Sequence, residues 1–228
     1  MPETVPPIAS KAMAENLFVV DHPLVADRVT RLRAATTDQM TFGRLAHEIA
    51  TSLAYEAFRD LPTTEVLIDT PVAENVASPR ITEQVVLIPI LRAGLGLVPA
   101  LQEMLPVTRV CHVGLRRNEA TLQADVYLDA LPKDLTGTRV VICDPMLATG
   151  GSLIHVADMV VDRGATDVTA LCLISSADGI ARSHGAHPTV RLFTAAVDPV
   201  LNEHGYIVPG LGDAGDRLFG APVRPSSA

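Results

Sequence analysis

A series of short apolar runs, rich in β-branched residues, alternates with stretches of helical periodicity along most of this chain. The runs occupy residues 66–68, 84–90, 109–114, 138–143, 167–174 and 190–196. Helical stretches lie between several of them, at residues 96–104, 152–163 and 177–184. Such runs are typical of buried strands, and βαβ alternation places them side by side in a mostly parallel sheet. We therefore expect an α/β fold, a mostly parallel sheet flanked by helices, with ligands beyond the carboxyl ends of the strands.

Two amphipathic helices are expected before the first run, at residues 23–35 and 37–58. The apolar positions that share one face of the second helix are Phe42, Leu45, Ile49 and Leu53. Thr36 or Thr37 is the expected N-cap, and Leu61 before Pro62 is the expected stop, because a residue that precedes proline resists helical geometry. These apolar faces could either cover the sheet or form an interface with another subunit.

Residues 115–135 depart from the alternation. Residues 125–130 alternate like one arm of a hairpin and their neighbours are polar, so we interpret the segment as a flexible flap. At 228 residues the chain has the size of one α/β domain. We expect that domain at residues 16–220, with a flexible N-terminus at residues 1–15 and a flexible tail at residues 221–228.

Charge and cysteine usage narrow the functional classes. A net charge of -8 disfavours a large electropositive face, so we expect no nucleic-acid partner. Cys111, Cys143 and Cys172 each lie in an apolar run without a CxxC pair, which favours reduced core thiols and a cytoplasmic protein. The N-terminus is unlike a signal peptide, and Arg92 interrupts the longest apolar region, so no membrane segment is expected.

The strongest local signal is the stretch at residues 140–152, where an apolar strand ends in Asp144 and turns through glycines into a helix. Glycines let the backbone approach a phosphate closely, and successive N–H groups at a helix N-terminus face the anion. Asp144 could accept hydrogen bonds from a ribose diol. We call residues 144–152 the phosphate loop. The alternative is a simple glycine-rich turn capped by Ser152.

Arginines stand at two further turns. Arg92 follows an apolar strand at its ligand end, where a guanidinium could bind pyrophosphate, although a solvated loop arginine is the alternative. Arg116 and Arg117 begin the flap, which could close over a pyrophosphate and exclude water. The alternative for this pair is a charged surface turn.

A glycine-rich segment near the C-terminus, residues 204–216, shows neither helical nor strand periodicity over most of its length. Such a loop presents backbone groups, which could pair with the donor and acceptor edge of a flat base. We call it the base loop. Asp213 and Asp216 could orient a metal-bound water or a ribose hydroxyl, or could simply form turns.

Taken together and in this order, these segments resemble the uracil phosphoribosyltransferase family. The likeness runs from residue 21 to residue 220, about nine-tenths of the chain, and its long matches are residues 89–97, 144–152 and 205–220. The resemblance implies a type I phosphoribosyltransferase fold with a flap hairpin and a C-terminal base-binding segment. It also implies transfer of the phosphoribosyl group of 5-phosphoribosyl 1-diphosphate (PRPP) to uracil, which gives UMP and pyrophosphate in pyrimidine salvage.

The resemblance also implies particular site residues. Asp144, Arg117 and Asp213 would be catalytic. The residues expected to bind PRPP are Arg92, Arg117, Asp144, Pro145, Met146, Leu147, Ala148, Thr149, Gly150, Gly151, Ser152 and Asp213. The residues expected to bind uracil are Tyr206, Ile207, Gly212, Asp213 and Ala214. Mg²⁺ would accompany PRPP without a dedicated set of protein ligands, GTP is a candidate effector because it activates some relatives, and a homodimer or higher homo-oligomer is implied.

Two departures from the family pattern lie in or beside the flap. Arg116-Arg117-Asn118 stands where family members usually have Tyr-Arg-Asp, and Tyr127-Leu128-Asp129-Ala130 stands where a Tyr-Tyr-x-Lys run is usual. One hypothesis is that Arg116 supplies the charge of the missing lysine, and the other is that the changes alter turnover. Cys143 leaves Asp144 as a single acid, as in that family.

The implied reaction joins uracil N1 to the sugar C1 as pyrophosphate departs, without a covalent nucleophile. Positioning of two reactants and stabilisation of the leaving group would provide the catalysis. His22 and His204 are interpreted as structural. Two other hypotheses are a regulator of this fold that binds RNA and senses nucleotides, which the acidic charge disfavours, and a purine-specific relative.

Overall fold

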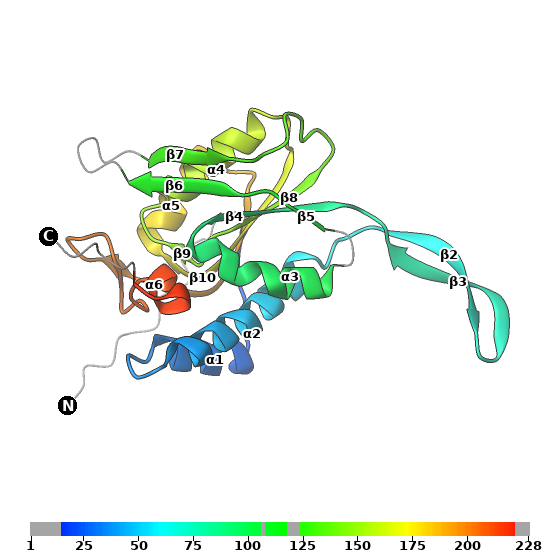
Figure 1. Ribbon diagram of the computed structural model, residues 1–228, viewed down its shortest axis with the longest axis horizontal. Helices are drawn as coiled ribbons and strands as arrows, with labels where there is room; N and C mark the ends of the chain where they lie inside the picture. Colours follow the sequence, from blue (N-terminus) through cyan, green and yellow to red (C-terminus); the bar gives the residue numbers. More distant parts are fainter. Residues whose placement is uncertain (1–14, 106–107, 118–123, 222–228) are drawn as a thin grey trace, which may run out of the picture.

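A nine-stranded sheet forms the centre of the protein, for which a computed structural model describes residues 15–105, 108–117 and 124–221 (Figure 1). Its strands are β1 (Leu17–Val19), β4 (Val85–Leu91), β5 (Thr108–Val110), β6 (Val113–Arg117), β7 (Ala124–Asp129), β8 (Arg139–Cys143), β9 (Met146–Leu147), β10 (Asp167–Ser176) and β11 (Arg191–Asp198). The strand order is β1-β11-β10-β8-β4-β6-β7, with β9 beside β10 and β5 beside β4. Every recorded pairing in it is parallel except that of β6 with β7. The expected mostly parallel α/β sheet is confirmed.

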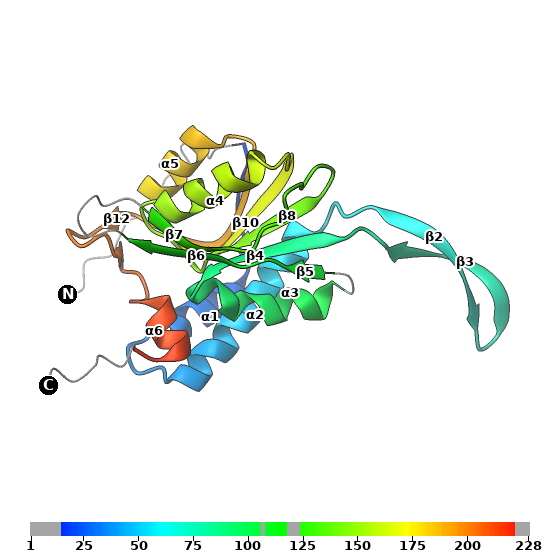
Figure 2. The same cartoon turned by 45° about the horizontal axis from the view of Figure 1, so that its top comes forward.

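Helices cover both faces of this sheet (Figure 2). On one face lie α1 (Pro23–Arg33), α2 (Gln39–Ala57), the 3₁₀ helix η1 (Ala93–Leu97) and α3 (Val98–Met104). On the other lie α4 (Gly151–Val161) and α5 (Ala177–Ala186). Because successive strand residues point to opposite faces, Val85 and Leu87 of β4 pack in the first core and Val86 and Ile88 in the second. Covering of both faces explains why the strands are continuously apolar.

The apolar face of α2 covers the sheet, which decides between the two alternatives left by the sequence. Its expected members Phe42, Leu45, Ile49 and Leu53 are at most 1% exposed. Burial of each such side chain contributes about 1.5–3 kcal/mol. The helix lies within the expected range of residues but begins and ends differently.

The expected N-cap of α2 is wrong. Asp38 caps the helix, and its carboxylate accepts a hydrogen bond from the Thr41 N–H at 2.9 Å. The Thr37 hydroxyl instead donates to the Arg31 carbonyl at 2.6 Å, which closes the turn between α1 and α2. At its other end α2 stops at Ala57, before the expected stop at Leu61.

A buried strand at residues 66–68 was expected; the strand is present, but its expected burial is wrong. These residues belong to β2 (Thr63–Thr70), which pairs with β3 (Ala73–Ile81) in a separate antiparallel ribbon. We call this ribbon the arm, and Figure 1 shows it extending away from the sheet. Leu67 is 66% exposed and Ile68 is 44% exposed. Their β-branched and apolar character predicts a strand, but it carries no information about what covers it.

The remaining differences are local. The run expected at residues 109–114 is interrupted after Val110, and β5 and β6 both continue along β4. The expected hairpin arm is present as β7, antiparallel to β6. The base loop contains β13 (Ile207–Val208), which pairs with β12 (Val200–Leu201), and leads into α6 (Ala214–Phe219).

Several predictions fall outside the described residues: flexibility of residues 1–14 and 222–228, and the flap tip at residues 118–123. The side chain of Arg117 also lies outside the described part, although its backbone pairs in β6. Within the described ranges, no helix is long and apolar enough to cross a membrane.

Candidate active site

The phosphate loop lies where β8 ends, at the carboxyl edge of the sheet. It borders a cavity of about 70 Å³ that is lined by Asp144 and residues 146–153. Pro145 was expected at this site but does not line the cavity. Its carbonyl instead accepts hydrogen bonds from the N–H groups of Leu173 and Ile174, at 2.9 and 3.1 Å. The structure therefore brings together all the predicted residues of this loop except Pro145.

Gly150 makes the turn into α4. Its φ of +81° is in the left-handed region, and an added Cβ would lie 2.8 Å from Ser183 Oγ. Gly150 is the N-cap of α4, and no side chain caps the helix. The alternative in which Ser152 caps a simple turn is therefore excluded. An uncapped helix N-terminus beside a cavity is suited to an anion.

Asp144 is the acid of this loop, and burial raises its pKa to about 7. The Met146 backbone N–H acts in the opposite direction by stabilising the carboxylate. Burial also raises the pKa of the preceding Cys143 thiol to about 12, which is consistent with a core thiol. Asp144 therefore exchanges its proton close to neutral pH, and a ribose diol that donates to it would favour the ionised form.

Helix α5 supports the phosphate loop from behind. The Ser176 hydroxyl donates to the Ala148 carbonyl at 2.5 Å and accepts from the Gly179 N–H at 2.8 Å. An added Cβ on Gly179 would lie 2.3 Å from the Ala148 oxygen. Only glycine permits this approach, and the contact holds the loop backbone in place.

A second cavity, of about 210 Å³, adjoins the first. It is lined by Ala93, Met146, Ala148, Gly205, Tyr206, Ile207, Gly212, Asp213, Ala214 and Gly215. All five residues expected to bind uracil are among them. The sequence reasoning missed Ala93, Gly205 and Gly215, although all three lie in the stretches that carry the family resemblance. Met146 and Ala148 line both cavities, so the two spaces share a wall.

Asn202, which precedes the base loop by two residues, holds the start of this loop through its backbone and its side chain. The Asn202 side-chain oxygen accepts from the N–H groups of His204 and Tyr206, at 3.0 and 2.9 Å. The Tyr206 carbonyl accepts from the Asn202 N–H at 2.9 Å. Both backbone groups of Tyr206 are thus paired with Asn202, and its ring is the part that can line the cavity. The Val208–Pro209 peptide bond is cis.

The predicted diphosphate ligand Arg92 lies beside this cavity but is paired within the protein. Its Nη2 atom lies 2.8 Å from Asp216 Oδ1, and both side chains are half-exposed. Asp213 is the N-cap of α6, since its Oδ1 atom accepts from the Asp216 N–H at 2.8 Å. One carboxylate oxygen of Asp213 therefore has a structural role, as the alternative for this residue proposed.

The flap contributes one described arginine side chain. Arg116 is 72% exposed at its side chain, and its Nε atom lies 4.0 Å from Asp125 Oδ2 on the paired strand β7. The predicted ligand Arg117 cannot be placed in the same way because its side chain is outside the described part.

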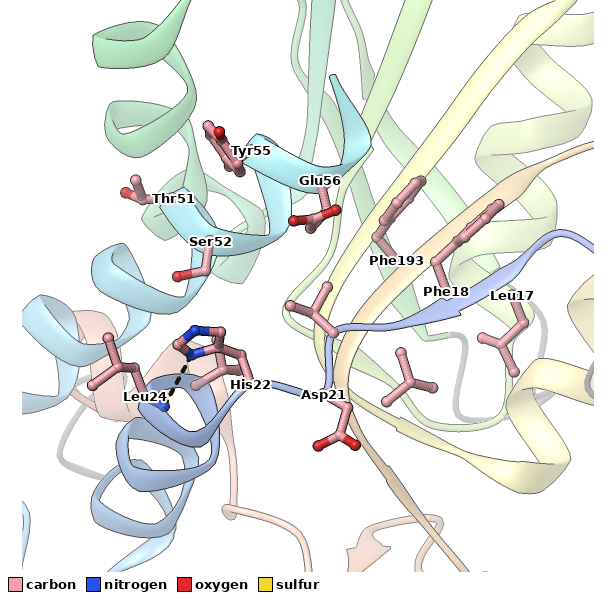
Figure 3. Close-up of a pocket in the computed structure, with 13 residues that line it drawn as sticks. Leu17, Phe18, Asp21, His22, Leu24, Thr51, Ser52, Tyr55, Glu56 and Phe193 are labelled. Atoms are coloured by element: carbon pink, nitrogen blue, oxygen red, sulfur yellow. Dashed lines mark hydrogen bonds between the residues drawn. The ribbon is translucent and has the colours of Figure 1, made fainter. Parts of the chain in front are cut away.

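A cavity of about 860 Å³, larger than these two, lies elsewhere in the described part of the chain, between β1, α1 and α2. Figure 3 shows Phe18, Phe193 and Tyr55 around it, together with the hydrogen bond between His22 and Leu24. It shares no lining residue with the two cavities at the carboxyl edge. Its mostly apolar wall has no glycine-rich loop, so the smaller cavities are the better substrate sites.

Comparison with known proteins agrees with this geometry. The family model described as uracil phosphoribosyltransferase matches residues 19–221. The uracil phosphoribosyltransferase of Streptococcus pneumoniae (strain R6) is 46% identical over 205 residues, covering 90% of this chain and 98% of that protein. That of Streptococcus pyogenes serotype M5 is 46% identical over 202 residues, covering 89% and 97%. The solved structure of the AQ2163 protein from Aquifex aeolicus has a TM-score of 0.85 and 34% identity, covering 91% of this chain and 100% of that one.

Proposed function

The chain belongs to the uracil phosphoribosyltransferase family, and we propose that its two adjoining cavities hold the two substrates of that reaction. The enzyme transfers the phosphoribosyl group of PRPP to uracil, giving UMP and pyrophosphate in pyrimidine salvage. The proposal concerns which residues bind each substrate and how they act.

The shared wall of Met146 and Ala148 is the observation that carries the assignment. The reaction needs the sugar C1 next to uracil N1, so the ribose site and the base site must adjoin. A phosphate loop and a backbone-lined cavity that share two residues meet this need. Holding two reactants in contact can lower the activation barrier by up to ~7–11 kcal/mol. We expect it to provide several kcal/mol of the barrier reduction here.

In this assignment the phosphate loop holds the ribose 5-phosphate. Backbone N–H groups around Gly150 and Gly151 and the hydroxyls of Thr149 and Ser152 would bind the phosphate, supported by the uncapped start of α4. The Asp144 carboxylate would accept hydrogen bonds from the ribose diol. Its pKa of about 7 supports this role, because an ionised carboxylate is accessible at neutral pH.

The diphosphate would bind between Arg92, Arg117 and the start of α6. Arg92 must exchange Asp216 for the phosphate oxygens when PRPP enters. Asp213 would face the sugar diphosphate with the oxygen that does not cap α6. Arg116, at the neighbouring backbone position, is exposed but lies 4.0 Å from the Asp125 carboxylate, so it would add positive charge at the diphosphate only by leaving Asp125.

Uracil would lie in the cavity of about 210 Å³, with backbone groups of Ile207 and Gly212 to Ala214 at its donor and acceptor edge. Backbone recognition of this kind penalises a base whose groups do not match, because it leaves buried polar atoms unpaired. The Tyr206 ring would cover the base.

Bond formation then follows from position. The C1–N1 bond forms as the C1–O bond to the diphosphate breaks, the electron pair leaves with pyrophosphate, and N1 loses its proton. Positive charge develops on the ribose in the transition state, where the Asp144 carboxylate lies nearby. No protein nucleophile is needed.

Mg²⁺ would arrive as part of the PRPP complex. Among the described residues, no group of three or more His, Cys, Asp or Glu side chains could hold a metal ion. Mg²⁺ is commonly held by one or two carboxylates together with substrate phosphates, so a single protein carboxylate would fit. Asp213, exposed at the mouth of the base cavity, is the proposed contribution. When bound, the ion neutralises charge on the leaving diphosphate.

The assay for this function supplies PRPP and Mg²⁺ with uracil, cytosine, hypoxanthine or orotate and measures pyrophosphate release. Of the four bases, only uracil is expected to cause pyrophosphate release. A preference for hypoxanthine would instead indicate a purine enzyme. Adding GTP to the same assay tests its proposed role as effector, which rests on family membership. An RNA-binding regulator would show RNA affinity that falls steeply with salt, which we do not expect here.

We also propose a homo-oligomer, most simply a homodimer. The arm supports this, because it exposes Val72 (94%) and Leu67 (66%) on a two-stranded ribbon, a structure that is marginal in water alone. Leu67→Asp should lower the mass measured by light scattering, and an unchanged mass would remove the arm from the interface. A cytoplasmic location is proposed because the three buried cysteines are free thiols.

A further inference from the structure

We propose that Arg33 and Asp198 form a buried ionic clamp that positions the base loop and thereby sets the affinity for uracil. The inference rests on the proposed assignment of the base loop to uracil. Neither residue lines the base cavity, so both would act as positioning residues through the loop backbone.

The clamp joins two distant elements. Arg33 lies in the last turn of α1, and Asp198 is the last residue of β11. The Nη1 and Nη2 atoms of Arg33 lie 2.7 Å from Oδ2 and Oδ1 of Asp198, a bidentate arrangement. The Asp198 side chain is 6% exposed and that of Arg33 is 20% exposed, so solvent screens this pair weakly.

Both backbone polar groups of Gly210 are held by this clamp. The Gly210 N–H donates to Asp198 Oδ2 at 3.0 Å, and the Gly210 carbonyl accepts from Arg33 Nη1 at 2.8 Å. Gly210 has a φ of +63°, and an added Cβ would lie 2.0 Å from the Ile207 carbonyl oxygen. Gly210 is therefore packed against Ile207, so fixing one fixes the other.

A second arginine anchors the next residue of the loop. Arg217 Nη1 donates to the Leu211 carbonyl at 3.0 Å and to the Leu32 carbonyl at 2.7 Å. Its guanidinium lies 4.3 Å from the centroid of the Phe42 ring, within range for a cation–π interaction. The end of α1 thus holds the base loop at two successive residues, between Ile207 and Gly212.

The position of the clamp explains how it can influence substrate affinity. The loop is proposed to recognise the base through backbone atoms, whose positions depend on what holds the main chain. Small shifts of such atoms weaken hydrogen bonds steeply, so a binding site needs supporting contacts behind it. A buried ion pair is weak evidence for stability, since its desolvation cost offsets its attraction.

Two substitutions of Arg33 test the clamp. Arg33→Lys keeps the charge, but its single amino group cannot reproduce the contacts that two nitrogens make with Asp198 and Gly210. Arg33→Met removes them all. We expect the KM for uracil to rise in both variants, by about tenfold or more for Met and less for Lys. The KM for PRPP should rise much less than the KM for uracil, because of the proposed PRPP ligands only Asp213 lies on the base loop, and Asp213 is fixed separately as the N-cap of α6.

Arg28→Met is the matched control. Arg28 lies on the same helix and pairs with Glu48 of α2, at 3.0 Å, but contacts no residue of the base loop. The Arg28→Met variant should leave the KM for uracil and the KM for PRPP unchanged. A purely structural role of Arg33 would lower the melting temperature and the active fraction, yet leave the KM for uracil of the active enzyme unaltered.

A third variant separates failure of the clamp from failure of the base site. Tyr206→Ala should raise the KM for uracil if the cavity binds the base. If it does so while both Arg33 variants keep the wild-type value, the base site stands and the clamp is refuted. If Tyr206→Ala also leaves the KM for uracil unchanged, the assignment of the base loop to uracil is wrong, and the clamp proposal that rests on it is refuted as well. Equal increases in the KM for uracil and PRPP would also overturn the inference.

Discussion

Arg92 Nη2 lies 2.8 Å from Asp216 Oδ1, which joins the turn after β4 to α6 across 124 residues of sequence. The arginine proposed to bind diphosphate thus has an internal anionic partner. Since both side chains are half-exposed, the pair contributes only about 0–1 kcal/mol. PRPP with its Mg²⁺ can therefore displace the carboxylate at little cost.

This pair makes the first prediction. Arg92→Ala should raise the KM for PRPP by about tenfold or more, because a charge-assisted contact with the diphosphate is lost. Asp216→Asn should lower that KM by a few-fold at most, because the competing charge is removed. Steady-state kinetics with varied PRPP measures both. A higher KM in Asp216→Asn would mean that Asp216 instead orients Arg92 for the substrate.

The second prediction concerns pH and Asp144. Its pKa is 3.8 in the unfolded reference and about 7 in the folded protein. The folded state therefore holds the proton more strongly, so this group lowers the free energy of unfolding as pH rises from about 4 to about 7, with no further change above that. Asp144→Asn should remove this contribution, measured as the difference between the two urea-unfolding curves at each pH.

Binding of PRPP should also depend on protonation of Asp144, but PRPP should bind more tightly as pH rises, whereas the free energy of unfolding falls. The ionised carboxylate is the form that accepts from the ribose diol, so the KM for PRPP should fall as pH rises through about 7. Asp144→Asn should show a higher and flatter profile. A wild-type slope that persists in the variant would assign the titration to another group.

Gly150 provides the third prediction. An alanine there would adopt a φ of +81° and place its Cβ 2.8 Å from Ser183 Oγ. Gly150→Ala should cost about 1–3 kcal/mol of stability and raise the KM for PRPP, because the phosphate loop must shift. Gly185→Ala is the control, since that position in α5 has open space and no positive φ. Calorimetry and kinetics of both variants check the prediction, and equal behaviour would contradict it.

The fourth prediction separates stability from catalysis. Arg139 begins β8, its side chain is 8% exposed, and it lies 2.8 Å from both Asp60 and Asp167. Arg139→Met should lower the free energy of unfolding by about 1.5–3 kcal/mol, because the contacts of a buried guanidinium with charged partners are lost, while Arg191 still pairs with Asp60 and Asp167. The KM values for uracil and PRPP should stay unchanged, since Asp144 lies at the other end of β8. Denaturant unfolding measures the loss.

A surface ion pair is the matched control for Arg139. Arg59, which is 68% exposed at its side chain, pairs with Glu56 one turn away. Arg59→Met should change the free energy of unfolding by less than about 1 kcal/mol. Comparable losses in the two variants would show that burial does not govern the strength of these pairs.

Much of the fold follows from local pattern. The strands at β4, β8, β10 and β11 are continuous apolar runs, and such runs predict a sheet covered on both faces. The phosphate loop is also local, because strand, acid, glycines and helix are consecutive in the sequence. In contrast, the two apolar residues Leu67 and Ile68 look like core positions and lie on the exposed arm. No local pattern states which surface will cover a strand.

The sequence by itself determined most of the helices and the central strands, the order of the substrate-binding segments and the family. These depend on periodicity and on residues that are close in the chain. Only the tertiary structure decided that Arg92 pairs with Asp216 and that Arg33 and Asp198, separated by 165 residues, hold Gly210. Charged partners are chosen by which elements the sheet brings together, and residue types alone do not encode that choice. The phosphate loop can therefore be predicted from the sequence, whereas the contacts that position the base loop are known only from the tertiary structure.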